Sequence, residues 1–126
     1  MASRQKAEQK HILLIDDDPD LALGLSVRLR AHGYDVSAAP DAITGFAKVR
    51  NDEPDLVLLD LGLPGGDGLV VLERIRSNTN TQLTPVVVLT ARDLTYQAEA
   101  KKLGAQAYLQ KPVDNDVLLE TVAQFV

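Results

Sequence analysis

Short apolar runs alternate with longer segments of mixed polarity along almost the whole chain. Two of these runs, HILLI and DLVLL, are nearly continuously apolar, which is typical of strands buried on both faces of a sheet. Asp18-Pro19 has the form of a helix start, and Gly33 that of a helix end. The pattern predicts strands at His11–Ile15, Tyr34–Ala39, Asp55–Leu59, Pro85–Leu89 and Ala107–Gln110, with helices at about 19–32, 41–50, 68–76, 93–103 and 114–126.

Five strands that alternate with five helices predict a doubly wound α/β domain. Its sheet is expected to be parallel, with right-handed crossovers and helices on both faces. We interpret the polar residues 1–10 (MASRQKAEQK) as a flexible leader and residues 11–126 as one domain without internal repeats. In such sheets the sites lie beyond the carboxyl ends of the strands, so the residues that follow each strand matter most.

Composition narrows the function classes. The 126 residues include 18 acidic and 13 basic side chains, for a net charge of −5, and no cysteine or tryptophan. Mass scaling gives burial of roughly two-thirds of the surface of the unfolded chain, enough for a core without disulfides. The missing cysteines exclude thiolate metal sites and cysteine nucleophiles. No apolar run matches a signal peptide or a membrane span, and the acidity disfavours nucleic acid as a partner. We expect a cytoplasmic protein.

Polar side chains stand at the end of four predicted strands. Asp16 and Asp17 follow the first strand, Asp60 the third, Thr90 the fourth and Lys111 the fifth. If the first and third strands are neighbours, the three carboxylates meet at one edge of the sheet, where they are costly unless a cation lies between them. Hard oxygen ligands of this kind suit Mg²⁺ (or Mn²⁺). Together with a lysine and a hydroxyl, such a site is suited to phosphoryl transfer, with an aspartate as nucleophile. Taken singly, each residue could be an ordinary loop or surface residue.

Asp18, in contrast, is expected to be only the N-cap of the first helix. In that helix Leu21, Leu25 and Leu29 form the apolar stripe that faces the core. Leu23 and Val27 then point away from this stripe, into solvent. Scattered exposed apolar residues are common. Because Leu23 and Val27 lie beside the expected site of the three aspartates, this patch could instead dock on a helical phosphodonor.

Four motifs together carry a family resemblance. The segments ILLIDDDPD, LVLLDLGLPGGDGL, VVVLTA and AYLQKP occur in the order and at the spacing of bacterial response-regulator receiver domains, which the chemotaxis-type receivers exemplify. The resemblance covers about residues 11–126 and implies a flavodoxin-like sheet in the order 2-1-3-4-5, with five helices. It also implies a signalling receiver that catalyses only its own phosphorylation and autodephosphorylation, rather than an enzyme that turns over external substrates.

Residue by residue, the resemblance implies Asp60 as phosphoacceptor. Asp17 would bind Mg²⁺ directly and Asp16 mostly through water, with Asp60 and the backbone carbonyl of Gly62 as the other protein ligands. Lys111 would pair with Asp60 or the phosphoryl group, and Thr90 would bond a phosphoryl oxygen. The Lys111-Pro112 bond would be cis.

The resemblance also implies a switch and partners. Thr90 would move toward the phosphoryl group and Tyr108 would follow it inward, changing the face formed by residues 93–103, 107–110 and 114–126. A sensor histidine kinase or a histidine phosphotransfer protein would supply the phosphoryl group, and an unspecified output partner or effector domain would receive the signal. A phosphorylation-dependent dimer stays open, and neither nucleic acid nor a membrane is expected to bind this domain.

Some positions depart from common members of the family. Leu63 stands where many have methionine, Gly62 offers no side chain to guide a water, and Arg92 occupies a position that tunes phosphate lifetime. In winged-helix transcription regulators, acids at the positions of Gln106-Ala107 usually pair with basic residues across a dimer. The chain lacks these acids, and its last helix lacks arginine. Both differences count against this dimer and against a DNA-binding parent protein of the winged-helix class.

Three rival functions fit parts of the pattern. A haloacid dehalogenase-type phosphohydrolase also uses Asp, Thr, Lys and Mg²⁺, but Asp60-Leu61-Gly62 lacks its second acid. A flavodoxin-like cofactor binder shares the fold, although three acids after the first strand would repel a phosphate. A scaffold receiver that is never phosphorylated would not need the complete set of site residues.

Overall fold

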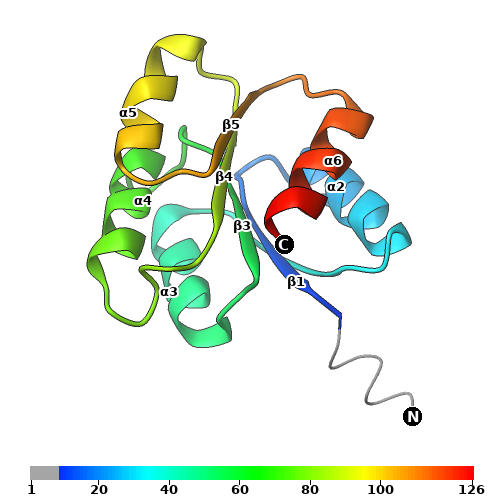
Figure 1. Ribbon diagram of the computed structural model, residues 1–126, viewed down its shortest axis with the longest axis horizontal. Helices are drawn as coiled ribbons and strands as arrows, with labels where there is room; N and C mark the ends of the chain where they lie inside the picture. The colour runs from blue at the N-terminus through cyan, green and yellow to red at the C-terminus, as the bar shows by residue number, and fades with distance from the viewer. Residues whose placement is uncertain (1–8) are drawn as a thin grey trace.

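The computed structural model describes residues 9–126, so most of the expected leader, residues 1–8, lies outside the described part. Strands and helices alternate along the chain, as Figure 1 shows. The strands are β1 (His11–Ile15), β2 (Asp35–Ala39), β3 (Leu56–Leu59), β4 (Val86–Thr90) and β5 (Ala107–Gln110). The helices are α2 (Pro19–Ala31), α3 (Ala42–Asp52), α4 (Gly68–Ser77), the 3₁₀ turn η1 (Leu94–Tyr96), α5 (Gln97–Lys102) and α6 (Asn115–Phe125).

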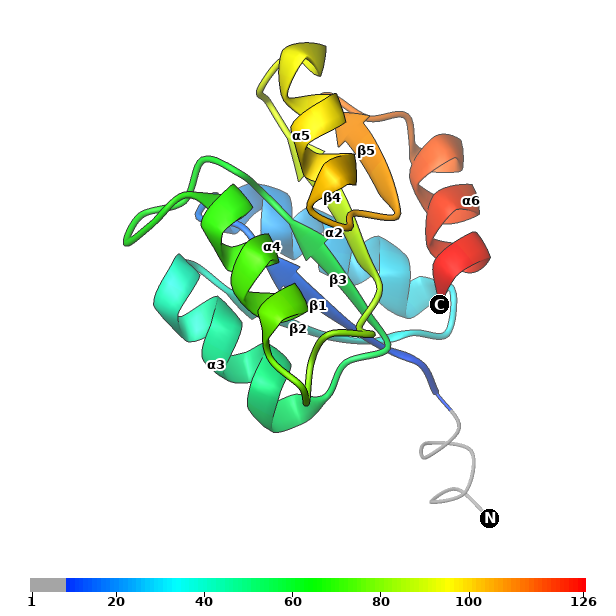
Figure 2. The ribbon, with the colours of Figure 1, turned by 60° about the vertical axis from the view of Figure 1, so that its left-hand side comes forward.

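All five strands are parallel and lie in the order β2-β1-β3-β4-β5, which confirms the predicted fold. Helices α2 and α6 cover one face, and α3, α4 and α5 cover the other (Figures 1 and 2). Successive residues of a strand point to opposite faces, so Ile12 and Leu14 pack under α2 and α6 while Leu13 and Ile15 pack on the other side. This burial on both faces explains the continuously apolar runs.

Aspartates begin most of the helices. The carboxylates of Asp18, Asp41, Asp67 and Asp114 accept backbone N–H groups in the first turns of α2, α3, α4 and α6. Gly33, which follows α2, has a φ of 91°, as expected for a left-handed helix end. Because each helix starts where the preceding strand ends, these caps surround the carboxyl edge of the sheet.

The helix predicted at 93–103 is divided in the structure. Asp93 caps η1 through the N–H of Thr95, and α5 begins only at Gln97. The reason lies at the Asp93 carbonyl, which accepts from the Tyr96 N–H three residues later and from the Tyr108 hydroxyl group. Bonding to the third residue instead of the fourth tightens the chain into a 3₁₀ turn.

On α2, Leu25 and Leu29 are buried and Leu21 is half-buried. Leu23 and Val27 are 64% and 59% exposed, so the expectation that they point into solvent is confirmed.

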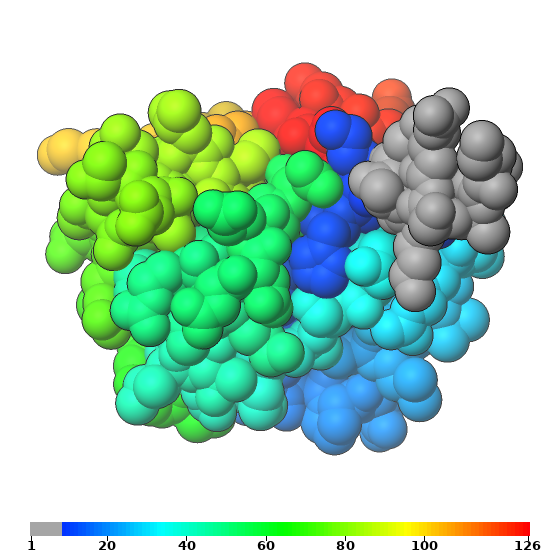
Figure 3. Space-filling view, turned by 90° about the horizontal axis from the view of Figure 1, so that it is seen from below, coloured from blue at the N-terminus to red at the C-terminus, as the bar shows by residue number. Residues whose placement is uncertain are grey.

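The opposite edge of the sheet, where the strands begin, is seen in Figure 3 with the end of the chain beside the start of β1. The carboxyl edge of the sheet, where the polar side chains follow the strands, and the edge where the strands begin thus lie at opposite ends of the molecule.

Candidate functional site

Three carboxylates meet at the carboxyl edge of the sheet. Asp16 and Asp17 follow β1 and Asp60 follows β3, and the pairing of Ile15 with Leu59 aligns the two strand ends. One carboxylate oxygen from each of the three lies within 4.8 Å of the others. Asp16 and Asp60 are buried and Asp17 is exposed. We call these three residues the acidic cluster; such crowding of negative charge favours a bound cation.

Lys111 reaches the acidic cluster from the end of β5. Its Nζ lies 2.6 Å from Asp16 Oδ2 and 3.6 Å from Asp60 Oδ2, and the lysine side chain is 18% exposed. The closer partner is therefore Asp16, whereas the resemblance implied Asp60 or a phosphoryl group. One ammonium group bridging two carboxylates offsets part of their repulsion.

Asp60 accepts two hydrogen bonds on the same oxygen. The Thr90 hydroxyl donates to Asp60 Oδ1 at 2.8 Å, and the Gly62 N–H donates to that oxygen at 3.3 Å. Asp60 Oδ2 has only the longer contact with Lys111. The two oxygens thus differ, and Oδ2 is the one with fewer partners in the described chain.

Asp18 has the structural role expected of it. Its side chain accepts from the backbone N–H groups of Asp20 and Leu21, and its own N–H donates to Asp16 Oδ1 at 2.9 Å. The start of α2 therefore orients Asp16 and leaves the carboxylate of Asp17 in solvent. Sequence reasoning correctly separated this capping aspartate from its two neighbours.

The acidic cluster fits a divalent cation by the chemistry of its donors. Carboxylate oxygens within 4.8 Å of one another are hard ligands, and Mg²⁺ retains several waters and needs few protein carboxylates. The exposed Asp17 gives the site a side open to water. Gly62 lies beside the cluster, since its N–H bonds Asp60, and the space around its Cα is open.

Tyr108 lies inside the molecule rather than at its surface. The side chain is 7% exposed, and its hydroxyl group donates to the carbonyl of Asp93 at 2.9 Å, with the carbonyl of Arg92 at 3.3 Å. Burial raises the pKa of the Tyr108 hydroxyl, and the nearby charge of Asp93 adds to this effect. Tyr108 is thereby joined to the loop that follows Thr90.

Sequence reasoning did not predict an ion pair between the loop after Thr90 and the start of α4. Arg92 Nη1 lies 3.1 and 3.2 Å from the two carboxylate oxygens of Asp67, and its guanidinium group lies 5.0 Å from the ring centroid of Tyr96. Asp67 also caps α4. The segment PGGDG, in which Asp67 directly precedes the first residue of α4, could have indicated the cap. Only the tertiary structure brings Arg92 to Asp67.

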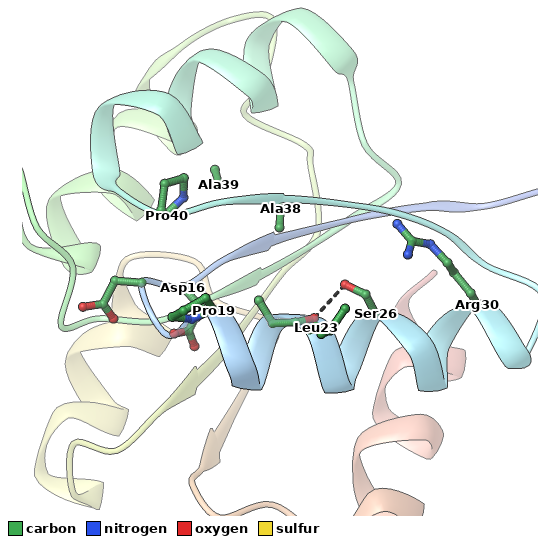
Figure 4. A pocket seen from close by; sticks show the side chains of 10 residues that line it. Asp16, Pro19, Leu23, Ser26, Arg30, Ala38, Ala39 and Pro40 are labelled. Carbon is green, nitrogen blue, oxygen red and sulfur yellow. Dashed lines mark hydrogen bonds between the residues drawn. The ribbon is translucent and has the colours of Figure 1, made fainter.

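Two hollows flank α2 and both reach the acidic cluster. One, of about 570 Å³, extends past Leu25 to Ala91 and the Lys111-Pro112 segment. The other, of about 500 Å³, runs between α2 and the edge strand β2, from Asp16 past Leu23 to Arg30 (Figure 4). The site is therefore accessible from two sides of one helix.

The comparisons with known proteins agree with this geometry. A family model described as the response regulator receiver domain matches residues 12–123. The chain belongs to this family. It is a signalling domain of the two-component type with an acidic site, not a conventional enzyme.

Relatives include both short and long proteins. Protein PilH of Pseudomonas aeruginosa is 36% identical over 112 residues, which cover 88% of this chain and 93% of PilH. The DNA-binding dual master transcriptional regulator RpaA of Synechocystis is 41% identical over 112 residues, but these cover only 46% of it. The chain thus spans about half the length of that relative and nearly all of PilH.

Solved structures show the same fold. A CheY-like receiver domain from Methanospirillum hungatei superimposes with a TM-score of 0.86 at 30% identity, covering 93% of each chain. The receiver domain of the Pseudomonas aeruginosa sensor kinase PA1611, with a magnesium ion coordinated in its active-site cleft, gives 0.85 at 29% identity, covering 93% of this chain and 97% of that one. Within residues 9–126 here, no helix has the length and apolarity needed to cross a bilayer.

Proposed function

We propose that this receiver accepts a phosphoryl group on Asp60 from a phosphohistidine of a sensor histidine kinase or a histidine phosphotransfer protein. The observation that carries the proposal is the environment of Asp60. Its carboxylate meets the Lys111 ammonium group and the Thr90 hydroxyl beside two further carboxylates. A reacting carboxylate, a fixed cation and a hydroxyl donor are what phosphoryl transfer to an aspartate requires.

The covalent step forms an acyl phosphate. Asp60 Oδ2, which has fewer partners than Oδ1, attacks the phosphorus, and the phosphorus–nitrogen bond of the donor breaks. The electron pair of that bond stays on the imidazole nitrogen, which takes a proton from water. Asp16, Asp17, Asp60 and the Gly62 carbonyl would hold Mg²⁺ (or Mn²⁺), which when bound supplies charge neutralisation for the phosphoryl oxygens.

Lys111 and Thr90 have distinct tasks in this proposal. The Lys111 ammonium group, 3.6 Å from Asp60 Oδ2, would pair with the phosphoryl oxygens that arrive there. Thr90 now donates its single hydroxyl proton to Asp60 Oδ1, so it must release that bond to donate to a phosphoryl oxygen. We propose that Thr90 exchanges this bond on phosphorylation and that its side chain then shifts toward the phosphoryl group.

We extend this to a switch through Tyr108. The loop that follows Thr90 carries the Arg92 and Asp93 carbonyls to which the Tyr108 hydroxyl donates, so a shift of Thr90 would alter the support of Tyr108. The response would reach the face formed by η1, α5, β5 and α6, where an output partner or effector domain would bind. A phosphorylation-dependent dimer through this face is the alternative readout.

The phosphorylation test is mass spectrometry after incubation with acetyl phosphate and Mg²⁺. We expect a gain of one phosphoryl group in the wild-type chain and no gain in Asp60→Asn, which keeps the shape of the side chain but removes the nucleophile. A gain that persists in Asp60→Asn contradicts the assignment of Asp60. No gain in the wild type favours a scaffold receiver instead.

The donor is proposed to dock on α2, at Leu23 and Val27. These side chains are largely exposed, one helical turn apart, and Leu23 lines the hollow that reaches Asp16. We expect charged substitutions, Leu23→Asp with Val27→Asp, to slow transfer from a phosphorylated histidine kinase at least tenfold, while labelling by acetyl phosphate is unchanged. Equal loss with both donors, or no loss with either, argues against docking at this patch.

The domain assignment completes the proposal. Residues 11–126 act as the receiver domain and 1–10 as a leader, and the domain works in the cytoplasm, where the kinase presents its phosphohistidine. The family match over residues 12–123 and the site geometry support the assignment of residues 11–126.

A further inference from the structure

Helices α3 and α4 lie side by side on one face of the sheet, and the surface between them carries no further element (Figure 2). Ile43, Phe46 and Arg50 occupy positions three and seven residues apart on α3, hence one flank of that helix. Val70 and Arg74, four apart, share a flank of α4. The contact of Arg74 with Phe46 shows that these flanks face each other. We call the surface formed by these five residues the α3–α4 groove, and it is hollowed at its Phe46, Arg50 and Arg74 end.

One end of the α3–α4 groove is basic. The guanidinium carbons of Arg74 and Arg50 lie 4.6 and 5.9 Å from the ring centroid of Phe46, which is 7% exposed. With Ser77 and Asn78 these three residues line a hollow of about 280 Å³. Two arginines from different helices therefore converge on a single aromatic ring.

Neither arginine has an acidic partner within residues 9–126. This stands out in a chain with a net charge of −5. The carboxyl ends of α3 and α4 stabilise cations nearby, but that effect does not require both to meet at one ring. A guanidinium group stacked on a ring keeps its N–H edges available, and these edges match a carboxylate.

The other end of the groove is apolar and exposed. Ile43 and Val70 stand in the first turns of α3 and α4 and are 70% and 52% exposed. A hydrogen bond from the Ala42 N–H to the Pro64 carbonyl, 3.1 Å long, ties the start of α3 to the loop that leads into α4. The apolar end is thus built on fixed backbone.

We propose that the α3–α4 groove docks an amphipathic helix of a partner protein. Its apolar side chains would cover Ile43 and Val70, and its carboxylates, about two turns further along, would pair with Arg50 and Arg74. The seven residues from Ile43 to Arg50 span about 10 Å of helix, which fits two turns of an occupant. This surface is separate from the proposed docking patch on α2 and from the proposed output face.

The test uses a synthetic helical peptide as probe. It carries two leucines one turn apart, followed two turns later by two glutamates, and a second peptide has lysines in place of the glutamates. In ¹⁵N NMR titrations of the full chain we expect the acidic peptide to shift amides of α3 and α4 and the lysine peptide not to. Arg50→Glu with Arg74→Glu should weaken binding about tenfold. Ile43→Ser should weaken it as well.

Matched controls are an exposed arginine and an exposed apolar residue on other helices, Arg28→Glu and Val117→Ser, which should leave the affinity unchanged. The proposal is overturned if both peptides bind equally, if the shifts lie outside α3 and α4, or if there are no shifts at all. In those cases the arginines only shield Phe46. Concentration-dependent shifts of the groove without peptide would assign it to a second copy of the chain instead. Labelling of Asp60 by acetyl phosphate should persist in the Arg50→Glu, Arg74→Glu variant, so the two proposals fail independently.

Discussion

The Tyr108 hydroxyl group has one proton to donate, and it donates it to the Asp93 carbonyl. An ionised phenolate can only accept, so ionisation breaks this bond and places a negative charge beside a carbonyl oxygen. Burial raises the pKa of Tyr108, and the nearby charge of Asp93 adds to this effect. The titration of Tyr108, which we propose as a switch residue, therefore also reports on its hydrogen bond to the loop after Thr90.

A pH titration tests this contact. The folded pKa of Tyr108 is raised above its ordinary value of 10.0, so the unfolded chain loses this proton first as the pH rises. The contribution of Tyr108 to stability is thus complete below about pH 10 and decreases above it. We expect urea unfolding between pH 8 and 11 to show this loss in the wild type and less of it in Tyr108→Phe.

The half-buried Tyr34 provides the control, because it packs on the face of the sheet that α2 and α6 cover, and Tyr34→Phe should retain the alkaline loss. Absorbance of the phenolate gives an independent readout. If Tyr108→Phe and the wild type lose the same free energy of unfolding over this range, the hydroxyl contact does not govern the titration.

The elements place the site through close packing of α4 on the end of β3. The first residue of α4 is Gly68, and a Cβ there would lie 2.3 Å from the Asp60 carbonyl oxygen and 2.5 Å from the Leu61 Cα. The N–H of Gly68 also donates to the Leu61 carbonyl at 2.8 Å. The helix start thus supports the backbone of the proposed phosphoacceptor directly.

We predict that Gly68→Ala destabilises the fold by roughly 1–3 kcal/mol, since the obstructing atoms are backbone atoms that cannot rotate away. It should also slow labelling of Asp60 by acetyl phosphate, because relief of the clash displaces Asp60. The matched variant is Gly24→Ala in the interior of α2, where a Cβ meets nothing within 4 Å. That change should raise the stability by up to about 1 kcal/mol. Similar urea midpoints for the two variants would contradict this packing argument.

In the whole molecule, the acidic cluster would couple folding to the binding of a cation. Three carboxylates share one edge of the sheet, and within residues 9–126 a single lysine offsets them. A cation that binds only the folded chain stabilises it by about 2.7 kcal/mol at a concentration one hundred times its dissociation constant. Magnesium should therefore raise the melting temperature of the wild-type chain in proportion to the logarithm of its concentration.

Asp17→Asn separates repulsion from binding, because Asp17 is exposed and its substitution leaves the ion pair between the buried Asp16 and Lys111 intact. Without metal, this variant should be more stable than the wild type by about 1 kcal/mol, since one of three crowded charges is gone. With Mg²⁺ its melting temperature should no longer rise. Calorimetry with and without EDTA measures both effects, and an unchanged response to Mg²⁺ would exclude Asp17 as a ligand.

Much of this molecule follows from local pattern. The apolar runs predict the strands because a parallel sheet buries both faces, and the order of strands and helices limits the topology to a few choices. Asp18 could be identified as a cap because its role depends on the next three residues alone. The residues of the acidic cluster could be listed as well, since they lie within two residues of the end of a predicted strand.

Contacts between loops were beyond such reasoning. The helix predicted at 93–103 is divided where the Asp93 carbonyl also accepts from the Tyr108 hydroxyl group, 15 positions away. The pairing of Lys111 with Asp16 joins residues 95 positions apart, and that of Arg92 with Asp67 joins residues 25 apart. The sequence by itself thus determined which strands form and which groups reach the polar edge. Only the tertiary structure decided which oxygen each donor bonds and which helices share Phe46, because these depend on distances that chain order does not set.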